Sequence, residues 1–195
     1  GGIGVAVSDK PEGPFKDALG KPLIGEIVNG AQPIDQFVFR DDDGQYYMYY
    51  GGWGHCNMVR LNDDLLSLKP FEDGEMYKEV TPENYVEGPW IYKRDGHYYN
   101  VYASMGEGRE TISYAMAENI EGPWTNMGEL SGMAEDSFTI HPGVIDYKGK
   151  SYLFYHNSTL SLEGYGPATG RRSICVDEMF YNADGSIPPV IQTKA

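Results

Sequence analysis

The chain has 195 residues, of which 41% are hydrophobic, and a formal net charge of −14. This length can bury a substantial core, whereas the negative charge opposes contact with phosphate backbones and anionic lipid surfaces. We therefore expect no nucleic-acid partner and no membrane partner, and no apolar run approaches the ~20 residues that span a bilayer.

The composition predicts an all-β protein. Sixteen tyrosines favour strands over helices, and 25 glycines and 12 prolines are scattered along the chain as breaks between many short elements. The best helical candidate, Asn62–Leu68, is about two turns long and is better interpreted as a loop. The two cysteines, Cys56 and Cys175, do not make a disulfide framework.

The first element in chain order belongs to a repeated signature. The sequences AVSDKPEGPF at Ala6–Phe15 and AMAENIEGPW at Ala115–Trp124 are 109 residues apart. The strands that lead into them, Ile3–Val7 and Ile112–Met116, are predicted to be outer strands, each followed by a Gly-Pro turn that leaves the sheet. The chain therefore opens partway through a repeat, and residues 1–16 are its outer-strand remnant.

Three hairpins follow at nearly equal spacing. Each has an apolar run, a turn and an aromatic strand, and the turn glycines are 52 and 53 residues apart. The hairpins are predicted at Ile34–Tyr50, Pro89–Tyr102 and Gly143–Tyr155, with turns at Asp43-Gly44, Asp95-Gly96 and Lys148-Gly149. Their outer strands are predicted at Cys56–Leu61, Thr111–Ala117 and Ser173–Tyr181. Short strands repeated at this period are typical of the four-stranded blades of a β-propeller.

The blade boundaries follow from the repeats. We expect blades at about 32–75, 84–127 and 138–190, in addition to the remnant at the N-terminus. About three and a half blades do not close a ring, because propellers use about four to eight. Roughly 100 further residues, about two blades by the repeat length, are therefore expected N-terminal to Gly1, as a second chain or as a lost segment.

Three residues open the hairpins at equivalent places. They are Asp35, Glu87 and His141, which are 52 and 54 residues apart. Equivalent places in a radial array face one axis, so the two carboxyl groups and the imidazole are predicted to meet in a central channel and to form a hydrolytic site. Glu12 and Glu121 also begin a Glu-Gly-Pro-aromatic run, but each follows an outer strand, and we expect neither to be catalytic.

Five segments, in this order and spacing, resemble glycoside hydrolase family 43. They are IGVAVSDKPEGPF, PIDQFVFRDDDGQYYMYYGG, EGPWIYKRDGHYY, HPGVIDYKGKSYLFYHN and RRSICVDEMFYNADGSIPP. The resemblance covers essentially the whole chain and implies a five-bladed β-propeller that hydrolyses arabinose- and xylose-containing plant polysaccharides with inversion. The segments EGPW and RRSICVDE resemble those of exo-acting α-L-arabinofuranosidases and β-xylosidases more than those of endo-arabinanases. A secreted or periplasmic location is favoured.

The resemblance also implies roles for single residues. Glu87 matches the general acid, and Asp35 matches an aspartate that tunes the pKa of the acid and orients it, whereas the general base has no counterpart in this chain. His141 matches an axial histidine that is associated, through water, with a calcium or other ion in the channel, and no organic cofactor is implied. Arg171 or Arg172 matches an arginine that reaches the substrate. Since adjacent residues of a strand point to opposite faces, only one of the two can do so.

The chemistry of inversion predicts the protonation states. One carboxyl group must be protonated to donate to the leaving oxygen, while another is ionised and activates water. We expect an ionised Asp35 to raise the pKa of Glu87, with further desolvation from Trp90 and Ile91, while Asp35 itself stays ionised.

Aromatic rings are candidate platforms for the C–H face of a pentose. The candidates are Trp53, Trp90, Tyr114 and Phe138. Trp90 and Phe138 are favoured as substrate-binding residues because they flank the residues that open the hairpins.

Two other functions stay open. A propeller that lacks the base could bind sugar without hydrolysing it, and it would then be a binding module or an inactive fragment. A related five-bladed fructan hydrolase has a similar architecture, but the EGPW and HPG segments speak against it.

Overall fold

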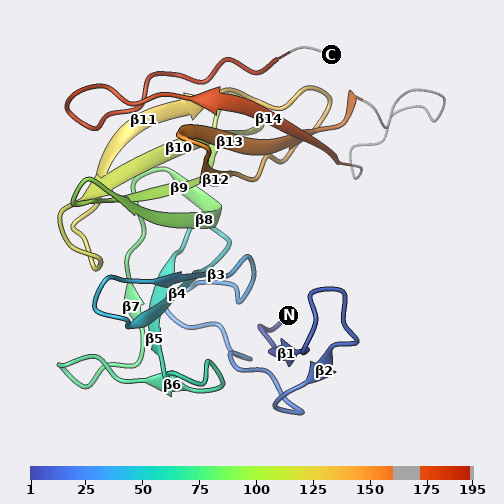
Figure 1. Ribbon diagram of the computed structural model, residues 1–195, viewed down its shortest axis with the longest axis vertical. Helices are drawn as coiled ribbons and strands as arrows, with labels where there is room; N and C mark the ends of the chain where they lie inside the picture. The colour runs from blue at the N-terminus through green and yellow to red at the C-terminus, as the bar shows by residue number, and fades with distance from the viewer. Residues whose placement is uncertain (160–171, 194–195) are drawn as a thin grey trace.

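The computed structural model describes residues 1–159 and 172–193 (Figure 1). In these residues fourteen strands form four antiparallel sheets, and the expectation of an all-β fold is confirmed. Among the described residues, no helix has the length and hydrophobicity needed to cross a membrane.

The sheets follow one another in chain order. The N-terminal hairpin consists of β1 (Ala6–Val7) and β2 (Lys16–Asp17). The second sheet contains β3 (Phe37–Arg40), β4 (Tyr46–Tyr50), β5 (Asn57–Leu61) and β6 (Leu68–Lys69), with β7 (Lys78–Glu79) also paired to β5. The third contains β8 (Tyr85–Arg94), β9 (His97–Met105), β10 (Glu110–Ala117) and β11 (Thr125–Ser131). The fourth contains β12 (Gly143–Tyr147), β13 (Lys150–Asn157) and β14 (Ser173–Met179).

The three predicted hairpin turns are present. Asp95-Gly96 and Lys148-Gly149 are two-residue turns. The φ angle is 50° at Asp95 and 86° at Gly96, and it is 50° at Lys148 and 78° at Gly149. Positive φ at both central residues is the requirement of a type I′ turn, and glycine at the second place meets it without a Cβ clash. In the first hairpin Gly44 has a φ of 88°, and its N–H donates to the carbonyl of Asp41 at 2.9 Å.

The two Glu-Gly-Pro turns do not leave their sheets, so that prediction was wrong. After the turn that contains Gly122, the chain returns as β11 and pairs with β10, and the turn that contains Gly13 joins β1 to β2 in the same way. By returning, β11 satisfies backbone N–H and C=O groups along β10. Trp124 also packs edge-on against Tyr49 of the second sheet, with the ring centroids 6.4 Å apart.

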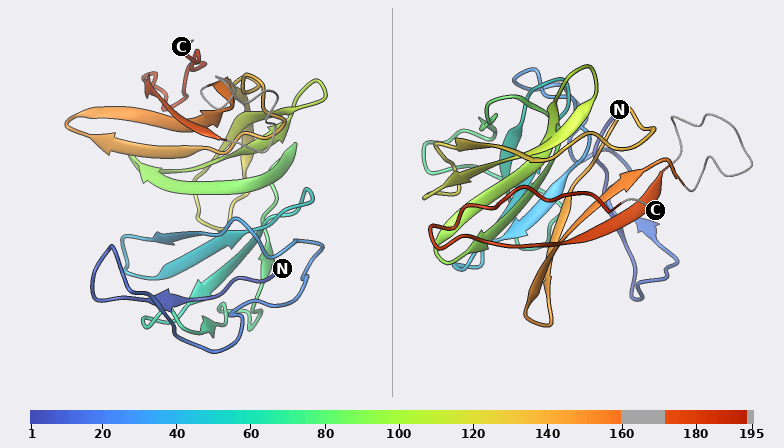
Figure 2. Two further views of the ribbon diagram at one scale, coloured as in Figure 1. Left: turned by 90° about the vertical axis from the view of Figure 1, so that its right-hand side faces the viewer. Right: turned by 90° about the horizontal axis from the view of Figure 1, so that it is seen from above.

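Figure 2 shows the sheets one after another along the molecule, and three clusters of buried side chains join the N-terminal segment and the three larger sheets. Successive residues of a strand face opposite sides. Tyr49 of β4 therefore belongs to the cluster that contains Ile91 of β8, while Tyr50 belongs to the cluster that contains Ile3 of the N-terminal segment. A third cluster joins the sheet of β8–β11 to the sheet of β12–β14.

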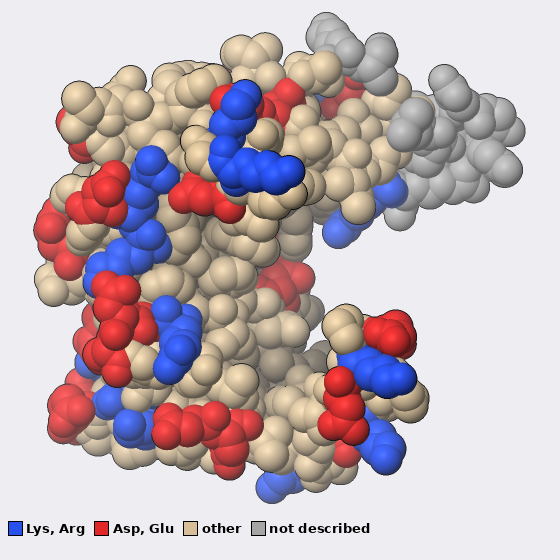
Figure 3. Space-filling view, in the orientation of Figure 1, with Lys and Arg blue, Asp and Glu red and all other residues tan. Residues whose placement is uncertain are grey.

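The last sheet has one buried face and one exposed apolar face. Leu153 of β13 lies in the core shared with the preceding sheet, whereas Phe154 is exposed on the other side. Ile145, Ile174 and Val176 are exposed as well, and Ile174 has 82% of its surface accessible. The space-filling view shows a deep notch between this end of the molecule and the N-terminal hairpin, with acidic side chains at its back (Figure 3).

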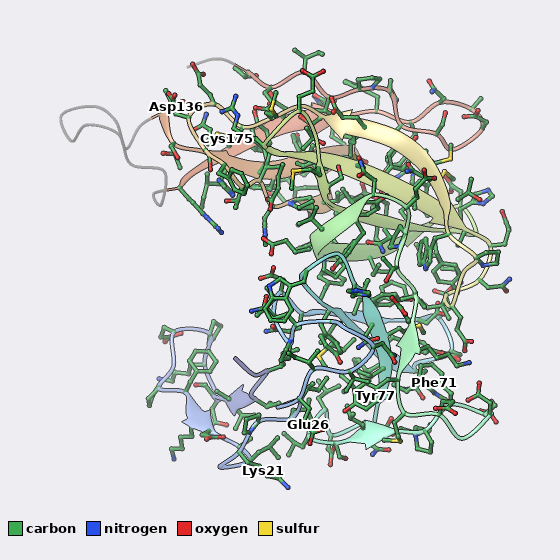
Figure 4. All side chains as sticks on the ribbon, turned by 180° about the vertical axis from the view of Figure 1, so that it is seen from behind. Lys21, Glu26, Phe71, Tyr77, Asp136 and Cys175 are labelled. Atoms are coloured by element: carbon green, nitrogen blue, oxygen red, sulfur yellow. The ribbon has the colours of Figure 1, made fainter. Side chains whose placement is uncertain are left out.

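Both cysteines are free thiols. Cys56 is buried in the cluster that contains Phe71, and Cys175 lies on β14. Seen from behind, Phe71 and Cys175 are at opposite ends of the molecule (Figure 4). The segment Asn62–Leu68 is a turn and the start of β6, as the loop interpretation expected.

Candidate active site

The first strands of the three larger sheets bring Asp35, Glu87 and His141 together. Asp35 lies two residues before β3, His141 lies two residues before β12, and Glu87 lies within β8, which contacts both of these strands. One carboxylate oxygen of Asp35, one of Glu87 and one ring nitrogen of His141 all lie within 4.8 Å of one another. The predicted convergence of these three residues is therefore confirmed.

The backbone around the site is irregular where the side chains must turn inward. Asp35 has a φ of 54°, a left-handed conformation that aspartate tolerates better than most residues. The pairing of β8 with β9 shifts register on either side of Glu87, and Gly88 has a φ of 66°. A β-bulge of this kind re-aims the side chain beside it. A Cβ on Gly88 would lie 3.2 Å from the ring of His141, so the glycine lets the imidazole approach.

A hydrogen bond joins the imidazole to one of the carboxylates. Nε2 of His141 lies 3.0 Å from Oε1 of Glu87 and 3.7 Å from Oδ2 of Asp35. Burial by itself lowers the pKa of His141, but the hydrogen bond to Glu87 and the negative charges of both carboxylates outweigh it and raise the pKa above its usual value. The imidazole is therefore a favourable place for a proton beside Glu87.

The pKa of Glu87 shifts in the direction opposite to the expected one, and the pKa of Asp35 is raised. The hydrogen bond from His141 lowers the pKa of Glu87, although burial opposes this shift. Burial raises the pKa of Asp35, and the charge on Glu87 adds to the rise while His141 opposes it. The expectation failed because it considered only the two acids, whereas the closest partner of Glu87 is a histidine from the next sheet.

The family model of glycosyl hydrolases family 43 matches residues 1–187 of this chain. The chain belongs to this family. It is 40% identical to a β-D-galactofuranosidase of Aspergillus niger, over 97% of this chain and 55% of that protein. It is 32% identical to a xylosidase/arabinosidase of Bacteroides ovatus, over 95% of this chain and 64% of that protein.

Solved structures of family 43 enzymes have the same fold over this length. One is a β-xylosidase/α-arabinofuranosidase from a compost metagenome, with a TM-score of 0.79 and 32% identity, covering 96% of this chain and 65% of that one. Another is an α-L-arabinofuranosidase from Clostridium thermocellum, with a TM-score of 0.77 and 35% identity, covering 98% of this chain and 66% of that one. This family 43 chain thus spans between about half and two thirds of the length of these relatives.

The predicted substrate-binding residues lie at different distances from the site. Trp90 packs against Phe37 of β3 with the ring centroids 4.4 Å apart, and it lines an apolar cavity of about 500 Å³ together with His141 and Arg172. Arg172 also donates to Oγ1 of Thr139 at 3.3 Å. Neither carboxylate is in the wall of this cavity, so it borders the site on one side without containing it. Arg171 lies outside the described residues.

The other aromatic candidates differ in exposure. Phe138 is 52% exposed and is not among the residues that line the cavity, and Tyr114 is 2% exposed within a core cluster. Trp53 is 64% exposed, and the loop that carries it is tied to the backbone next to both acids. In this loop the N–H of Gly51 donates to Ile34 and the N–H of Gly54 donates to Val86. The loop that carries Trp53 is therefore joined to the backbone beside Asp35 and Glu87.

The side chains do not fit a directly bound calcium ion. Within the described residues, Asp35, Glu87 and His141 are the group that lies close enough to hold a metal. Calcium takes six to eight oxygen ligands, and two carboxylates with an imidazole do not supply such a shell. In addition, Nε2 of His141 is engaged by Glu87, and the ring lies against Gly88.

Of two polar residues near the site, sequence reasoning did not single out Glu110 and interpreted His156 as non-catalytic. Glu110 on β10 is buried, and it accepts a hydrogen bond from the backbone N–H of Ile140. His156 lines the apolar cavity, its ring centroid is 6.5 Å from that of His141, and burial lowers its pKa to about 4. For Glu110 the available signal was a carboxyl group at the start of a strand of otherwise buried residues, which indicates a specific partner.

Proposed function

We propose that the protein to which this chain belongs is a glycosidase of the inverting, exo-acting type, which removes terminal α-L-arabinofuranosyl or β-D-xylosyl units from plant polysaccharides such as arabinoxylan, xylan and arabinan. The observation that carries the proposal is the meeting of Glu87, Asp35 and His141 at one point between three sheets. Family relatives named β-xylosidase and arabinoxylan arabinofuranohydrolase support the choice of substrate.

In this mechanism Glu87 is the general acid. As the glycosidic C–O bond breaks, its carboxyl group gives a proton to the leaving oxygen, while water attacks the anomeric carbon from the opposite face and gives its own proton to the base. The hydrogen bond to His141 favours the ionised form of Glu87 in the free site. In the free site the proton therefore lies on His141, next to the ionised Glu87. When a bound sugar excludes water, transfer of this proton to the carboxyl group of Glu87 is favoured.

Asp35 is assigned the orienting and pKa-tuning role. Inverting enzymes hold acid and base about 6.5 to 9.5 Å apart to leave room for water. One carboxylate oxygen of Asp35 and one of Glu87 lie within 4.8 Å of each other, which is shorter than that separation. As the resemblance to family 43 implies, the base is proposed to come from a part of the protein outside this chain.

The stereochemistry of the product tests this assignment. Proton NMR of the first sugar released by the whole protein is expected to show the inverted anomer. Retention would instead make Asp35 a nucleophile, since retaining pairs are about 5 to 5.5 Å apart. Parallel assays with an aryl α-L-arabinofuranoside and an aryl β-D-xyloside identify the sugar.

The rival function is carbohydrate binding without hydrolysis. Within the described residues, Asp35 and Glu87 are the carboxylates that lie in one group with His141. Their nearest oxygens are closer together than the acid and the base of an inverting enzyme, and this favours binding without hydrolysis. A whole protein that binds xylotriose but releases no sugar from it would establish the binding function instead.

The fold of the whole protein is proposed to be a five-bladed propeller. The exposed apolar face of β12–β14 and the open notch support further propeller residues as the partner that covers them. Co-expression of this chain with the remaining part of the protein is expected to give a soluble monomer, whereas this chain alone is expected to self-associate.

A calcium ion, as the resemblance implies, is proposed to be held at His141 through water, with no step of hydrolysis passing through it. Calcium titration followed by the ¹⁵N shift of His141 tests this. Direct coordination would break the hydrogen bond to Glu87 and shift the Nε2 signal strongly, whereas water-mediated binding leaves that bond in place.

A further inference from the structure

The segment that carries His141 is held at one buried carboxyl group. This segment, residues 132–142, links β11 to β12 and passes the start of β10. The backbone N–H of Glu110 donates to the carbonyl of Phe138 at 3.0 Å, and the backbone N–H of Ile140 donates to Oε2 of Glu110 at 3.0 Å. One residue therefore bonds the segment twice, just before His141.

The carboxyl group of Glu110 is buried, and it therefore needs a hydrogen-bond donor such as the N–H of Ile140. The residue is 4% exposed, and Ile140, which donates to it, is fully buried in the core between the last two sheets. A buried carboxyl group without a hydrogen bond costs several times more than a neutral hydrogen bond gains. An apolar side chain would fill this place at a lower cost, so the acid requires an explanation beyond packing.

The position of the contact supplies that explanation. Ile140 precedes His141 directly, and the ring of His141 meets Glu87 at 3.0 Å and Asp35 at 3.7 Å. A shift of the Ile140 backbone moves the His141 ring by a similar amount, because a single peptide joins them. A displacement of about 1 Å at a reacting group can cost 10²-fold in rate.

We propose that Glu110 is a positioning residue, which holds the backbone of Ile140 so that the imidazole of His141 meets Glu87 and Asp35. Its oxygen acts as an acceptor, and the residue does not touch the substrate. The catalytic consequence rests on the proposed function, whereas the positioning of the backbone does not.

Three variants of the whole protein test the proposal. Glu110→Gln keeps an oxygen acceptor in the same shape, Glu110→Met removes the acceptor at similar volume, and Glu107→Gln changes an exposed acid of the same β9–β10 connection. Amide hydrogen exchange at Ile140 and the ¹⁵N shift of His141 are measured in each, together with kcat and KM for the aryl glycoside.

The expected result is a rescue pattern. Glu110→Met speeds exchange at Ile140 by at least about tenfold, moves the His141 signal and lowers kcat by about 10- to 100-fold with little change in KM. Glu110→Gln and Glu107→Gln stay close to the parent in all four measurements. A role in stability alone would lower the melting temperature of Glu110→Met but leave the His141 signal and kcat unchanged.

Two results would overturn the proposal. One is an unchanged His141 signal and unchanged Ile140 exchange in a folded Glu110→Met protein. The other is a Glu110→Gln variant as impaired as Glu110→Met, since the acceptor would then not be what matters. If the parent protein hydrolyses no glycoside, the proposed function fails, while exchange and the His141 signal still decide the role of Glu110.

Discussion

The same four residues, Glu-Gly-Pro-Trp, occur at 87–90 and at 121–124, and the two copies do different things. The first copy lies in β8, where Glu87 is half-buried and bonded to His141. The second forms the turn between β10 and β11, where Glu121 pairs with Lys78 at 2.6 Å on the surface. Chemistry is therefore assigned by the place of a motif in the sheet, and the motif alone does not determine it.

The two tryptophans extend this comparison. Trp90 packs on Phe37 and borders the cavity next to His141, whereas Trp124 packs on Tyr49 in the core between two sheets. The same residue type thus lines the cavity in one copy, as Trp90, and packs a turn against the neighbouring sheet in the other, as Trp124.

The largest expected difference between the two copies is catalytic. Glu87→Gln in the whole protein removes the proton donor and is expected to lower kcat/KM by about 10²- to 10⁴-fold. Glu121→Gln removes only a surface ion pair, which is typically worth about 0 to 1 kcal/mol, and is expected to leave kcat/KM unchanged. Steady-state kinetics of both variants check this, and similar losses in the two would contradict the assignment of Glu87.

The glycines of the two copies provide a finer test. Gly88 has a φ of 66° and Gly122 has a φ of 89°, so alanine at either place is expected to cost about 1 kcal/mol or more of stability. Gly88→Ala alone also pushes on the ring of His141, and we expect it to lower kcat by up to about 10²-fold. Denaturant unfolding and kinetics separate the two effects, and a fully active Gly88→Ala protein would argue against the close approach of His141.

The smallest effect is a pH dependence of stability. A histidine whose pKa is raised on folding binds its proton more tightly in the native state, so its contribution is full below the unfolded pKa and is lost as the pH rises through the folded pKa. The advantage of the parent over His141→Gln in the free energy of unfolding is therefore expected to shrink as the pH rises above about 6.5. Denaturant titrations from about pH 5 to 9 check this.

A control tests the origin of that dependence. Glu87→Gln removes the carboxylate that bonds His141 and is expected to flatten the difference, whereas Glu121→Gln is expected to preserve it. A difference that increases with pH would mean that burial outweighs the carboxylates at His141.

Sequence reasoning succeeded where adjacent residues carry the information. The turns at Asp95-Gly96 and Lys148-Gly149 were predictable from two residues each, because few residues adopt positive φ readily. The equal offsets of Asp35 and Glu87 from their turn glycines indicated equivalent places in two sheets, and the meeting of both with His141 followed from the repeat. The same reasoning failed for the Glu-Gly-Pro turns, since a chain reversal does not specify the next partner strand.

The amino-acid sequence by itself determined the three hairpins, their tight turns and the three residues that face one another, because side-chain alternation and turn chemistry are local and the repeat carries them around the molecule. The tertiary structure alone decided the directions in which the pKa values of Glu87 and Asp35 shift, and that Glu110 accepts a hydrogen bond from the segment before His141. These properties depend on distances of a few ångströms between side chains from different sheets, and no spacing along the chain encodes such distances.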